Sequence, residues 1–182
     1  MNTILDSGAV ERAQRWLASP IDEADKQAIR HMQHADPAGF NEAFYTELEF
    51  GTGGLRGLMR LGSNGMNRYT VGLATQGLAN YVRKASSTPS VAIAYDSRNQ
   101  SPEFARVAAD VLAANGVNVW LFDALRPTPE LSFAVRLHGC TAGIVITASH
   151  NPRNTTATRC TGATAARLFR RKTRNCWRRC AR

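Results

Sequence analysis

Three apolar segments at regular spacing constrain the fold of this chain more than any other feature. Residues 91–95, 117–122 and 142–147 are mostly continuous apolar runs, and their first residues are 26 and 25 positions apart. Such runs are typical of strands buried on both faces, and the spacing leaves room for one helix between successive strands. The sequence therefore predicts an α/β sandwich with a largely parallel sheet.

Helix-start signals occupy both intervals between these strands. Ser101-Pro102-Glu103 and Thr128-Pro129-Glu130 each combine a capping hydroxyl, a proline at the first helical position and an acidic first turn. Further upstream, helical apolar patterns cover residues 10–17, 22–32, 41–48 and 71–82. Residues 1–48 are therefore predicted to form a helical N-terminal extension whose role is packing.

The basic charge of the chain is confined to its end. The net charge is +9, but ten of the 23 Lys and Arg residues lie in residues 153–182, which contain no Asp or Glu. Residues 1–152 carry 13 basic and 14 acidic residues, a net charge of −1. A basic arm can bind nucleic acid through the phosphates. This tail contains one lysine and only two aromatic residues that could stack on bases, Phe169 and Trp177. Its composition therefore makes nucleic acid an unfavoured partner.

The cysteine content and the apolar segments indicate where in the cell this protein is expected. Cys140 is the only cysteine before the basic tail, which fits a reducing environment. The longest apolar stretch, residues 143–148, is far shorter than the roughly 20 residues of a membrane-spanning helix. No basic segment followed by an apolar run opens the chain. We therefore expect a soluble, cytoplasmic protein without a membrane partner.

Polar segments follow each of the three predicted strands. They are Asp96-Ser97-Arg98, residues 125–128, and Ser149-His150-Asn151-Pro152. Because ligands of parallel sheets bind beyond the carboxyl ends of the strands, these segments are candidate binding loops. Asp96 and Arg98 would place a carboxylate and a guanidinium there, although a plain surface ion pair explains them equally well.

The glycine-rich segment 51–57 is a fourth candidate. Its glycines let backbone N–H groups turn toward an anion, and Arg56 adds a charged fork suited to phosphate. The spacing is neither the dinucleotide fingerprint nor a Walker loop. A tight turn accounts for the same glycines, so the residues alone leave both interpretations open.

Ser149 is the candidate nucleophile. A serine on a sharp loop at the carboxyl end of a strand can act as a nucleophile or phosphate carrier. A Ser/Asn turn closed by Pro152 is the structural alternative. A Ser-His-Asp hydrolase is disfavoured, because adjacent Ser149 and His150 do not easily form the triad geometry and no Gly-x-Ser-x-Gly elbow surrounds Ser149.

Two motifs together carry a family resemblance. Thr147-Ala-Ser-His-Asn-Pro152 and Phe50-Gly-Thr-Gly-Gly-Leu-Arg-Gly57 resemble the α-D-phosphohexomutase superfamily, the phosphoglucomutases and phosphomannomutases. Residues 67–79 and the Asp96–Arg98 turn fit the same family. The helical extension is most similar to its phosphoglucomutase/phosphopentomutase branch. The resemblance implies a three-layer α/β/α sandwich with a mixed, largely parallel sheet, with an incomplete domain I over residues 49–153.

The resemblance also implies roles for single residues. Ser149 would be the phosphoserine, giving its phosphate to a hexose phosphate and taking back the other phosphate of the bisphosphate intermediate. A phosphoserine carries a charge of about −1.5 to −2. It would therefore need Mg²⁺, bound through the Ser149 phosphate, and cationic donors. The implied catalytic pair is Ser149 and His150, and the implied phosphate-binding residues are Arg56, Gly53, Gly54, Thr52, Arg98 and Asn151.

Residues 154–182 do not continue the family pattern. The family has Asn-Gly-Tyr-Lys here, with the lysine thought to be a general acid/base, whereas this chain has Thr158 or Arg159 near that place. One nucleotide restored before the codon for Asn154 makes the shifted codons compatible with Glu-Tyr-Asn-Gly-Tyr-Lys. We therefore interpret 154–182 as a disordered basic tail, translated out of frame. A zinc site on the three tail cysteines lacks a paired C-x-x-C.

These observations predict a phosphoglucomutase-type mutase, an isomerase that moves phosphate between C1 and C6 of a hexose phosphate. The implied cofactors are Mg²⁺ and a hexose 1,6-bisphosphate, and the implied partners are the hexose phosphate and the family's later domains. Without those domains we expect this chain to be close to inactive. Phosphomannomutase, phosphopentomutase and a non-catalytic phosphate-binding module with a nucleic-acid-binding tail are the open alternatives.

Overall fold

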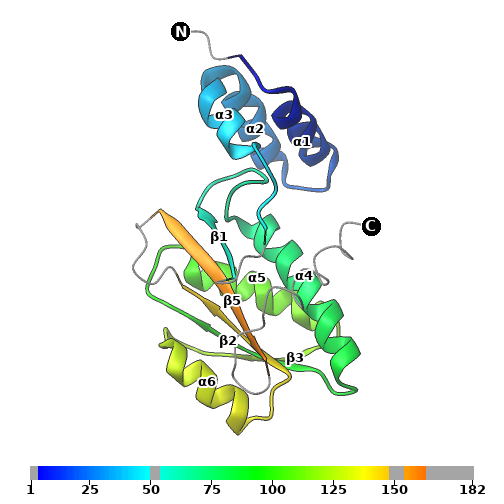
Figure 1. Cartoon of the computed structure of the whole chain (residues 1–182), viewed down its shortest axis with the longest axis vertical. Coiled ribbons are helices and arrows are strands. Elements are labelled where there is room, and N and C mark those ends of the chain that lie inside the picture. The colour runs from blue at the N-terminus through cyan, green and yellow to red at the C-terminus, as the bar shows by residue number, and fades with distance from the viewer. Residues whose placement is uncertain (1–3, 50–53, 148–153, 163–182) are drawn as a thin grey trace.

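The computed structural model describes residues 4–49, 54–147 and 154–162 (Figure 1). In chain order the elements are α1 (Ser7–Ala18), α2 (Glu23–Ala35), α3 (Pro37–Ala43), β1 (Leu55–Leu58), α4 (Arg68–Ala85), β2 (Ser90–Tyr95), α5 (Ser101–Ala114), β3 (Asn118–Leu121), α6 (Thr128–Leu137), β4 (Ala142–Ile146) and β5 (Thr155–Gly162). None of the helices in these ranges is long and apolar enough to cross a membrane.

The strands form one mixed sheet in the order β1-β5-β4-β2-β3. β2 pairs in parallel with β3 and with β4, whereas β5 runs antiparallel to both β4 and β1. The parallel pairings are those among the three regularly spaced strands. The predicted mixed α/β sheet is confirmed, with antiparallel pairing on the side of β1 and β5.

Helices cover both faces of the sheet. On β2, Val91 and Ile93 belong to the core that the sheet shares with α4 and α5. Ala92 and Ala94 point to the other face and pack with Leu131 of α6. Alternation of side chains along a strand sends neighbouring residues to opposite faces. The apolar run of β2 is continuous because this central strand is buried on both sides.

The apolar pattern does not predict β1 and β5. β1 lies within the glycine-rich segment, and β5 lies in the tail that we expected to be disordered. That expectation is wrong for residues 155–162. Thr156, Ala157 and Thr158 are buried there. Backbone pairing with β1 on one side and β4 on the other holds this strand in the sheet without an apolar run.

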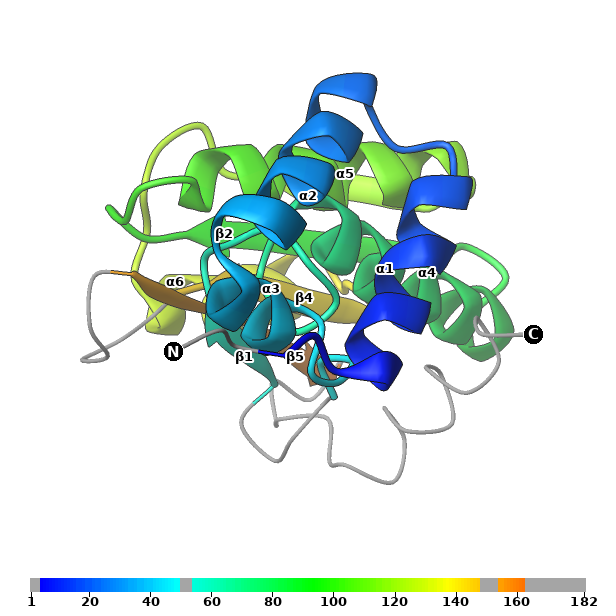
Figure 2. The same ribbon diagram turned by 90° about the horizontal axis from the view of Figure 1, so that it is seen from above.

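The helices α1, α2 and α3 lie together at one end of the molecule, and Figure 2 shows them in front of the sheet when the view is along the long axis. They pack around their own small core, which includes Ala9, Ala13, Ile29, Phe40 and Phe44. This segment is therefore a helical unit beside the sandwich, as the apolar patterns of the first residues predict.

The third helix begins and ends earlier than its apolar pattern predicts. The pattern predicted residues 41–48, whereas α3 covers Pro37–Ala43. Asp36 caps this helix by accepting a hydrogen bond from the Gly39 N–H, and Pro37 occupies the first turn. A cap and a proline fix a helix start more strongly than one apolar face does.

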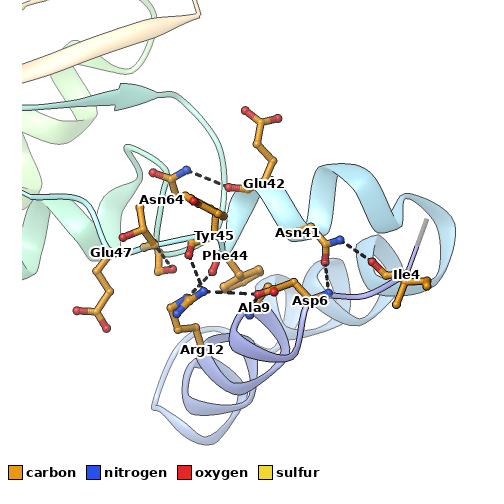
Figure 3. A network of polar contacts seen from close by, with 12 residues as sticks. Ile4, Asp6, Ala9, Arg12, Asn41, Glu42, Phe44, Tyr45, Glu47 and Asn64 are labelled. Atoms are coloured by element: carbon orange, nitrogen blue, oxygen red, sulfur yellow. Dashed lines mark hydrogen bonds and ion pairs between the residues drawn. The ribbon is translucent and has the colours of Figure 1, made fainter.

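The segment after α3 is held on two sides (Figure 3). The Arg12 guanidinium donates hydrogen bonds to the carbonyl oxygens of Phe44 and Tyr45. From the other side, the Asn64 side-chain amide donates to the Glu42 carbonyl at 3.0 Å. The Phe44 and Tyr45 carbonyl groups accept hydrogen bonds from an α1 side chain instead of from a further helical turn, and the helix ends at Ala43.

Candidate functional site

A row of paired residues crosses three strands at the carboxyl end of β4. Thr147 and Ala157 exchange both backbone hydrogen bonds, at 2.9 and 3.2 Å between nitrogen and oxygen. Ala157 is also the partner of Arg56 on β1. Neighbouring strands lie about 4.8 Å apart, so the backbone of Arg56 lies about 10 Å from that of Thr147. The row brings Arg56 to the point where the chain leaves the sheet toward Ser149.

Arg56 lies open on this edge. Its side chain is exposed. Among the described residues, no carboxylate forms an ion pair with it. An exposed guanidinium at the carboxyl end of a mixed α/β sheet is suited to receive an anion. Arg56 therefore lies exposed at the carboxyl end of the sheet, and its role in binding phosphate stays a prediction.

Gly54 has a structural reason to be glycine. Its φ is +105°, and a Cβ built there would lie 2.2 Å from the carbonyl oxygen of Thr158. The close approach of β1 to β5 therefore requires a residue without a side chain. For Gly54 this favours the turn interpretation, and its role in phosphate binding stays a prediction.

The loop after β2 is organised by Asp96. Its carboxylate accepts hydrogen bonds from the Arg98 backbone N–H at 3.0 Å and from the Ser101 hydroxyl at 2.8 Å. Its own N–H donates to the Ile146 carbonyl on β4 at 3.1 Å. Asp96 thereby fixes the turn that carries Arg98 beside the end of β4. These contacts tie the carboxylate to the loop backbone and to Ser101.

The loop after β3 adds Arg126, which the sequence analysis did not single out. Its backbone N–H donates to the Tyr95 carbonyl at 3.0 Å, so it lies at the same edge of the sheet. Its guanidinium pairs with Asp123 at 3.4 Å and with Glu130 at 3.3 Å. Segment 125–128 was a candidate loop, and an arginine just before the Pro-Thr-Pro helix start was the available signal.

The remaining predicted residues lie outside the described ranges. They are Ser149, His150, Asn151, Thr52 and Gly53. In the described part of the chain, no group of three or more His, Cys, Asp or Glu could hold a metal ion. The described residues alone therefore do not fit a magnesium site. The sequence analysis expected Mg²⁺ to be bound through the phosphate on Ser149. Their catalytic and binding roles stay predictions.

Comparison with known proteins identifies the domain. The family described as "Phosphoglucomutase/phosphomannomutase, alpha/beta/alpha domain I" matches residues 47–178. The chain belongs to this family. The matched range includes all four candidate loops, and it confirms the phosphohexomutase resemblance that the two motifs indicated.

Similar proteins of this family come from bacteria. The chain is 45% identical over 127 residues to a phosphoglucomutase of Staphylococcus haemolyticus, which covers 70% of this chain and 23% of that protein. It is 40% identical over 149 residues to a phosphoglucomutase of Staphylococcus aureus, which covers 81% of this chain and 27% of that protein. The chain therefore spans about a quarter of the length of these relatives.

Solved structures of the phosphohexomutase family share the fold. A putative phosphomannomutase from Thermus thermophilus superimposes with a TM-score of 0.67 and 27% identity, over 73% of this chain and 30% of that one. A Paramecium phosphoglucomutase, parafusin, superimposes with a TM-score of 0.62 and 22% identity, over 73% of this chain and 26% of that one. The second similarity supports the fold alone.

The family match continues into the basic tail. It extends to residue 178, beyond the break in composition after Pro152. Within that range, residues 155–162 form β5 and pair with β1 and β4. The phosphohexomutase domain of this chain therefore includes a strand contributed by the tail.

Proposed function

We propose that this chain is the phosphoserine-bearing domain of a phosphosugar mutase of the phosphoglucomutase type. The observation that carries the proposal is the row of Thr147, Ala157 and Arg56, which brings a guanidinium to the end of the strand that leads to Ser149. In this proposal Ser149 carries the phosphate and Arg56 stabilises its charge. His150 supports the loop or contacts the transferring group.

Charge neutralisation is the chemistry that the described residues can supply. A phosphoserine carries a charge of about −1.5 to −2 at neutral pH. Phosphoryl transfer is catalysed mainly by positioning and by stabilising charge on the phosphoryl oxygens. Arg56 on β1 and Arg98 in the loop after β2 lie on either side of the end of β4, so together they can hold phosphate there. Bound Mg²⁺ would add Lewis-acid stabilisation of the same charge.

The substrate proposed is a hexose phosphate, with a hexose 1,6-bisphosphate as intermediate and activator. Glucose is preferred because the curated relatives with 40–45% identity are phosphoglucomutases. The similarity to a putative phosphomannomutase, at 27% identity, is the observation that keeps mannose as the second candidate. Comparing phosphorylation by glucose and mannose 1,6-bisphosphates would separate the two.

Phosphorylation of Ser149 is the direct test. The purified chain is incubated with glucose 1,6-bisphosphate carrying ³²P and with Mg²⁺, and the labelled residue is located by peptide mass spectrometry. We expect the label on Ser149 and its loss in Ser149→Ala. Arg56→Met is expected to label at least tenfold more slowly, since a charge-assisted contact is removed. No label on the folded wild-type chain would contradict the proposal.

Turnover by the chain itself is expected to be close to zero. The chain spans about a quarter of the length of its phosphoglucomutase relatives, and we propose that the later domains complete the active site. Conversion of glucose 1-phosphate to glucose 6-phosphate is measured with a coupled dehydrogenase, using an intact phosphoglucomutase as positive control. Readily measurable conversion by the 182 residues would overturn this part of the proposal.

The origin of the tail is a separate proposal. We propose that residues 154–182 are translated out of frame, because their composition breaks sharply from that of residues 1–152. Sequencing the gene across and beyond this region tests it directly. One added base should open a frame that reads Asn-Gly-Tyr-Lys and continues as a mutase. Confirmation of the given frame, with no mutase sequence following in any frame, would make the tail a genuine part of the protein.

A further inference from the structure

The strand β3 leaves one edge of the sheet open. Among the described strands it pairs with β2, and the sheet ends there. The N–H group of Phe122 donates inward to the Ile93 carbonyl at 3.1 Å, and that of Asn118 donates to the residue before β2. Backbone groups point to alternate sides along a strand, so those of Val119 and Leu121 point outward. The edge therefore offers two residues for pairing with another strand.

This edge carries none of the residues that usually prevent strand pairing. Residues 116–122 contain no Lys, Arg, Asp, Glu or Pro. Charged side chains and prolines are common on the edge strands of sheets that stay unpaired. Trp120 is 50% exposed, and it lies on the α6 face because its partner Ala92 packs with Leu131 of α6. The edge is thus uncharged and has a large apolar side chain at its centre.

A cavity of about 390 Å³ lies between β3 and α6. Its lining includes Trp120 from the strand and Phe133 and Leu137 from the helix, and the last two are 58% and 63% exposed. The His138 ring stacks on the Trp120 indole with 4.1 Å between ring centroids. The cavity is therefore open beside the edge and can receive apolar side chains from a strand that pairs with β3.

The other face of the sheet has room for a second helix at this edge. α5 packs on β2 and β3 and has α4 on one side. Val107 and Val111 face α4, where they lie near Gly72. Ala109 and Ala113 lie on the opposite side of α5, since residues four apart share a helix face. Small side chains therefore face the edge, and a helix can approach α5 there to about 8–10 Å.

We propose that β3 is the interface with a second copy of this chain, which pairs antiparallel to it across a two-fold axis. Val119 of each copy would exchange hydrogen bonds with Leu121 of the other, which places the two Trp120 side chains opposite each other. Directly opposite residues have Cβ atoms about 4.5–5.5 Å apart. The carboxyl ends of the two sheets then point in opposite directions, so both candidate phosphate sites stay open. The interface does not depend on the proposed function.

A second copy fits both faces of this edge. Its Trp120 and Phe133 would close the cavity, and its α5 would lie along Ala109 and Ala113. A bound peptide would cover the strand and the cavity but leave this side of α5 exposed. An aromatic side chain buries about 150–250 Å², so the two half-exposed rings offer about 200 Å² per copy. With the strand and α5 each copy contributes about 600 Å², below the standard of about 800 Å², and we expect a micromolar dissociation constant.

Sedimentation velocity of the full chain, from about 1 to 200 μM, tests the interface. We expect a monomer–dimer equilibrium without larger species, because two-fold pairing uses the β3 edge of both copies. Trp120→Lys places two ammonium groups opposite each other and should weaken dimerisation about tenfold or more. Leu73→Lys on α4 is the matched control, because Leu73 is also 50% exposed, and its dimer affinity should stay within twofold of wild type. Circular dichroism verifies that each variant is folded.

Hydrogen exchange of the wild-type chain, followed by NMR, gives a second readout. Between the low and the high end of the same concentration range we expect slower exchange of the Val119 and Leu121 amides. The amides of Asn118 and Phe122 already donate inward, so their exchange should change little. Association through side chains alone does not produce this alternation. The measurement applies even if Trp120→Lys does not fold.

Three results would overturn the proposal. A chain that stays monomeric at about 200 μM would leave this face to a different partner. Association that continues beyond the dimer, or that Trp120→Lys and Leu73→Lys weaken equally, would exclude a closed pair at β3. A dimer without the alternating protection of Val119 and Leu121 would mean that the copies meet elsewhere on the surface.

Discussion

At position 54 the backbone of β1 comes too close to β5 for a side chain. We expect Gly54→Ala to lower the free energy of unfolding by about 2 kcal/mol or more, because the methyl group meets the Thr158 carbonyl and φ is +105°. Urea unfolding measures this.

Gly72→Ala on α4 is the control, since its Cβ meets only Val107 and Val111 at 3.8 and 3.9 Å. Alanine there should stabilise the helix by about 0.5–1 kcal/mol. Equal effects at both positions would contradict the steric account.

Thr158 buries a hydroxyl group in the main core. Its Oγ1 atom has no hydrogen-bond partner among the described residues. Thr158→Val replaces the hydroxyl by a methyl group of similar size, so we expect the free energy of unfolding to rise by about 1 kcal/mol. Urea unfolding of the full chain checks the sign.

Thr70 provides the matched control for that substitution. Its hydroxyl is also buried, but it donates to the Gly65 carbonyl at 2.8 Å and accepts from the Asn67 N–H at 3.0 Å. Thr70→Val should therefore lower the free energy of unfolding by about 1–2 kcal/mol. A loss of stability in Thr158→Val of similar size would show that the Thr158 hydroxyl is satisfied in solution.

Between elements, an ionic cluster joins α2 to α4. The Asp25 carboxylate accepts hydrogen bonds from the Arg68 guanidinium and the Tyr69 hydroxyl. Trp16 of α1 packs edge-on against the Tyr69 ring at 5.6 Å between centroids. Burial acts to raise the pKa of Asp25, but the hydrogen bonds from Tyr69 and Arg68 outweigh it, and the pKa is lowered from 3.8. The helical extension is thus fastened to the sandwich by a charged contact.

This cluster predicts a pH dependence of stability. Because the folded-state pKa of Asp25 is lowered, its contribution is fully present above about pH 4 and is lost as the pH falls through the folded value. Asp25→Asn should cost about 1 kcal/mol at pH 7 and at pH 5 and less at pH 3. Urea unfolding at pH 7, 5 and 3 measures the difference. Asp110→Asn, an exposed residue of α5, is the control and should show no such trend. If the free energies of unfolding of wild type and Asp25→Asn differed by the same amount at all three pH values, the proposed role of the Asp25 pKa would be contradicted.

At the scale of the whole molecule, large apolar side chains are exposed along β3 and α6. Trp120 is 50%, Phe133 58% and Leu137 63% exposed. β3 is also an edge strand of the sheet. Adjacent apolar side chains beside an open sheet edge favour self-association. This face is where the described part of the chain is most prone to aggregate.

Phe133→Lys should reduce that aggregation without unfolding the protein. An exposed substitution on α6 is expected to change the free energy of unfolding by no more than about 0.5 kcal/mol. Static light scattering at increasing protein concentration is the measurement. Leu73→Lys on α4, at a leucine that is 50% exposed, is the control and should leave the scattering unchanged. An equal decrease in light scattering for both variants would show that the added charge alone reduces aggregation.

The accuracy of the sequence prediction differs among the elements. The helices after β2 and β3 begin at residues 101 and 128, next to the predicted starts. The prediction that Ser101 and Thr128 cap these helices is wrong, because both are the first helical residues and the N-cap residues Gln100 and Pro127 make no side-chain cap hydrogen bond. The third helix was misplaced, because residues 44–48 have an apolar pattern but their carbonyl partners lie in α1 and the loop before α4. Arg56 was predicted as a site residue from its glycine neighbours. The strand β5 was not predicted, since the tail has no apolar alternation to indicate a strand.

The sequence by itself determined the three regularly spaced strands, the helices between them and the family. These features depend on apolar runs, helix-start prolines and motifs that act within a few residues. Only the tertiary structure decided that β1 and β5 exist, that Gly54 must lack a side chain and that Arg56 lies in one row with Ala157 and Thr147. Those facts depend on backbone pairing between segments about 100 residues apart, and such pairing leaves little trace in local composition when a strand is held by both neighbours.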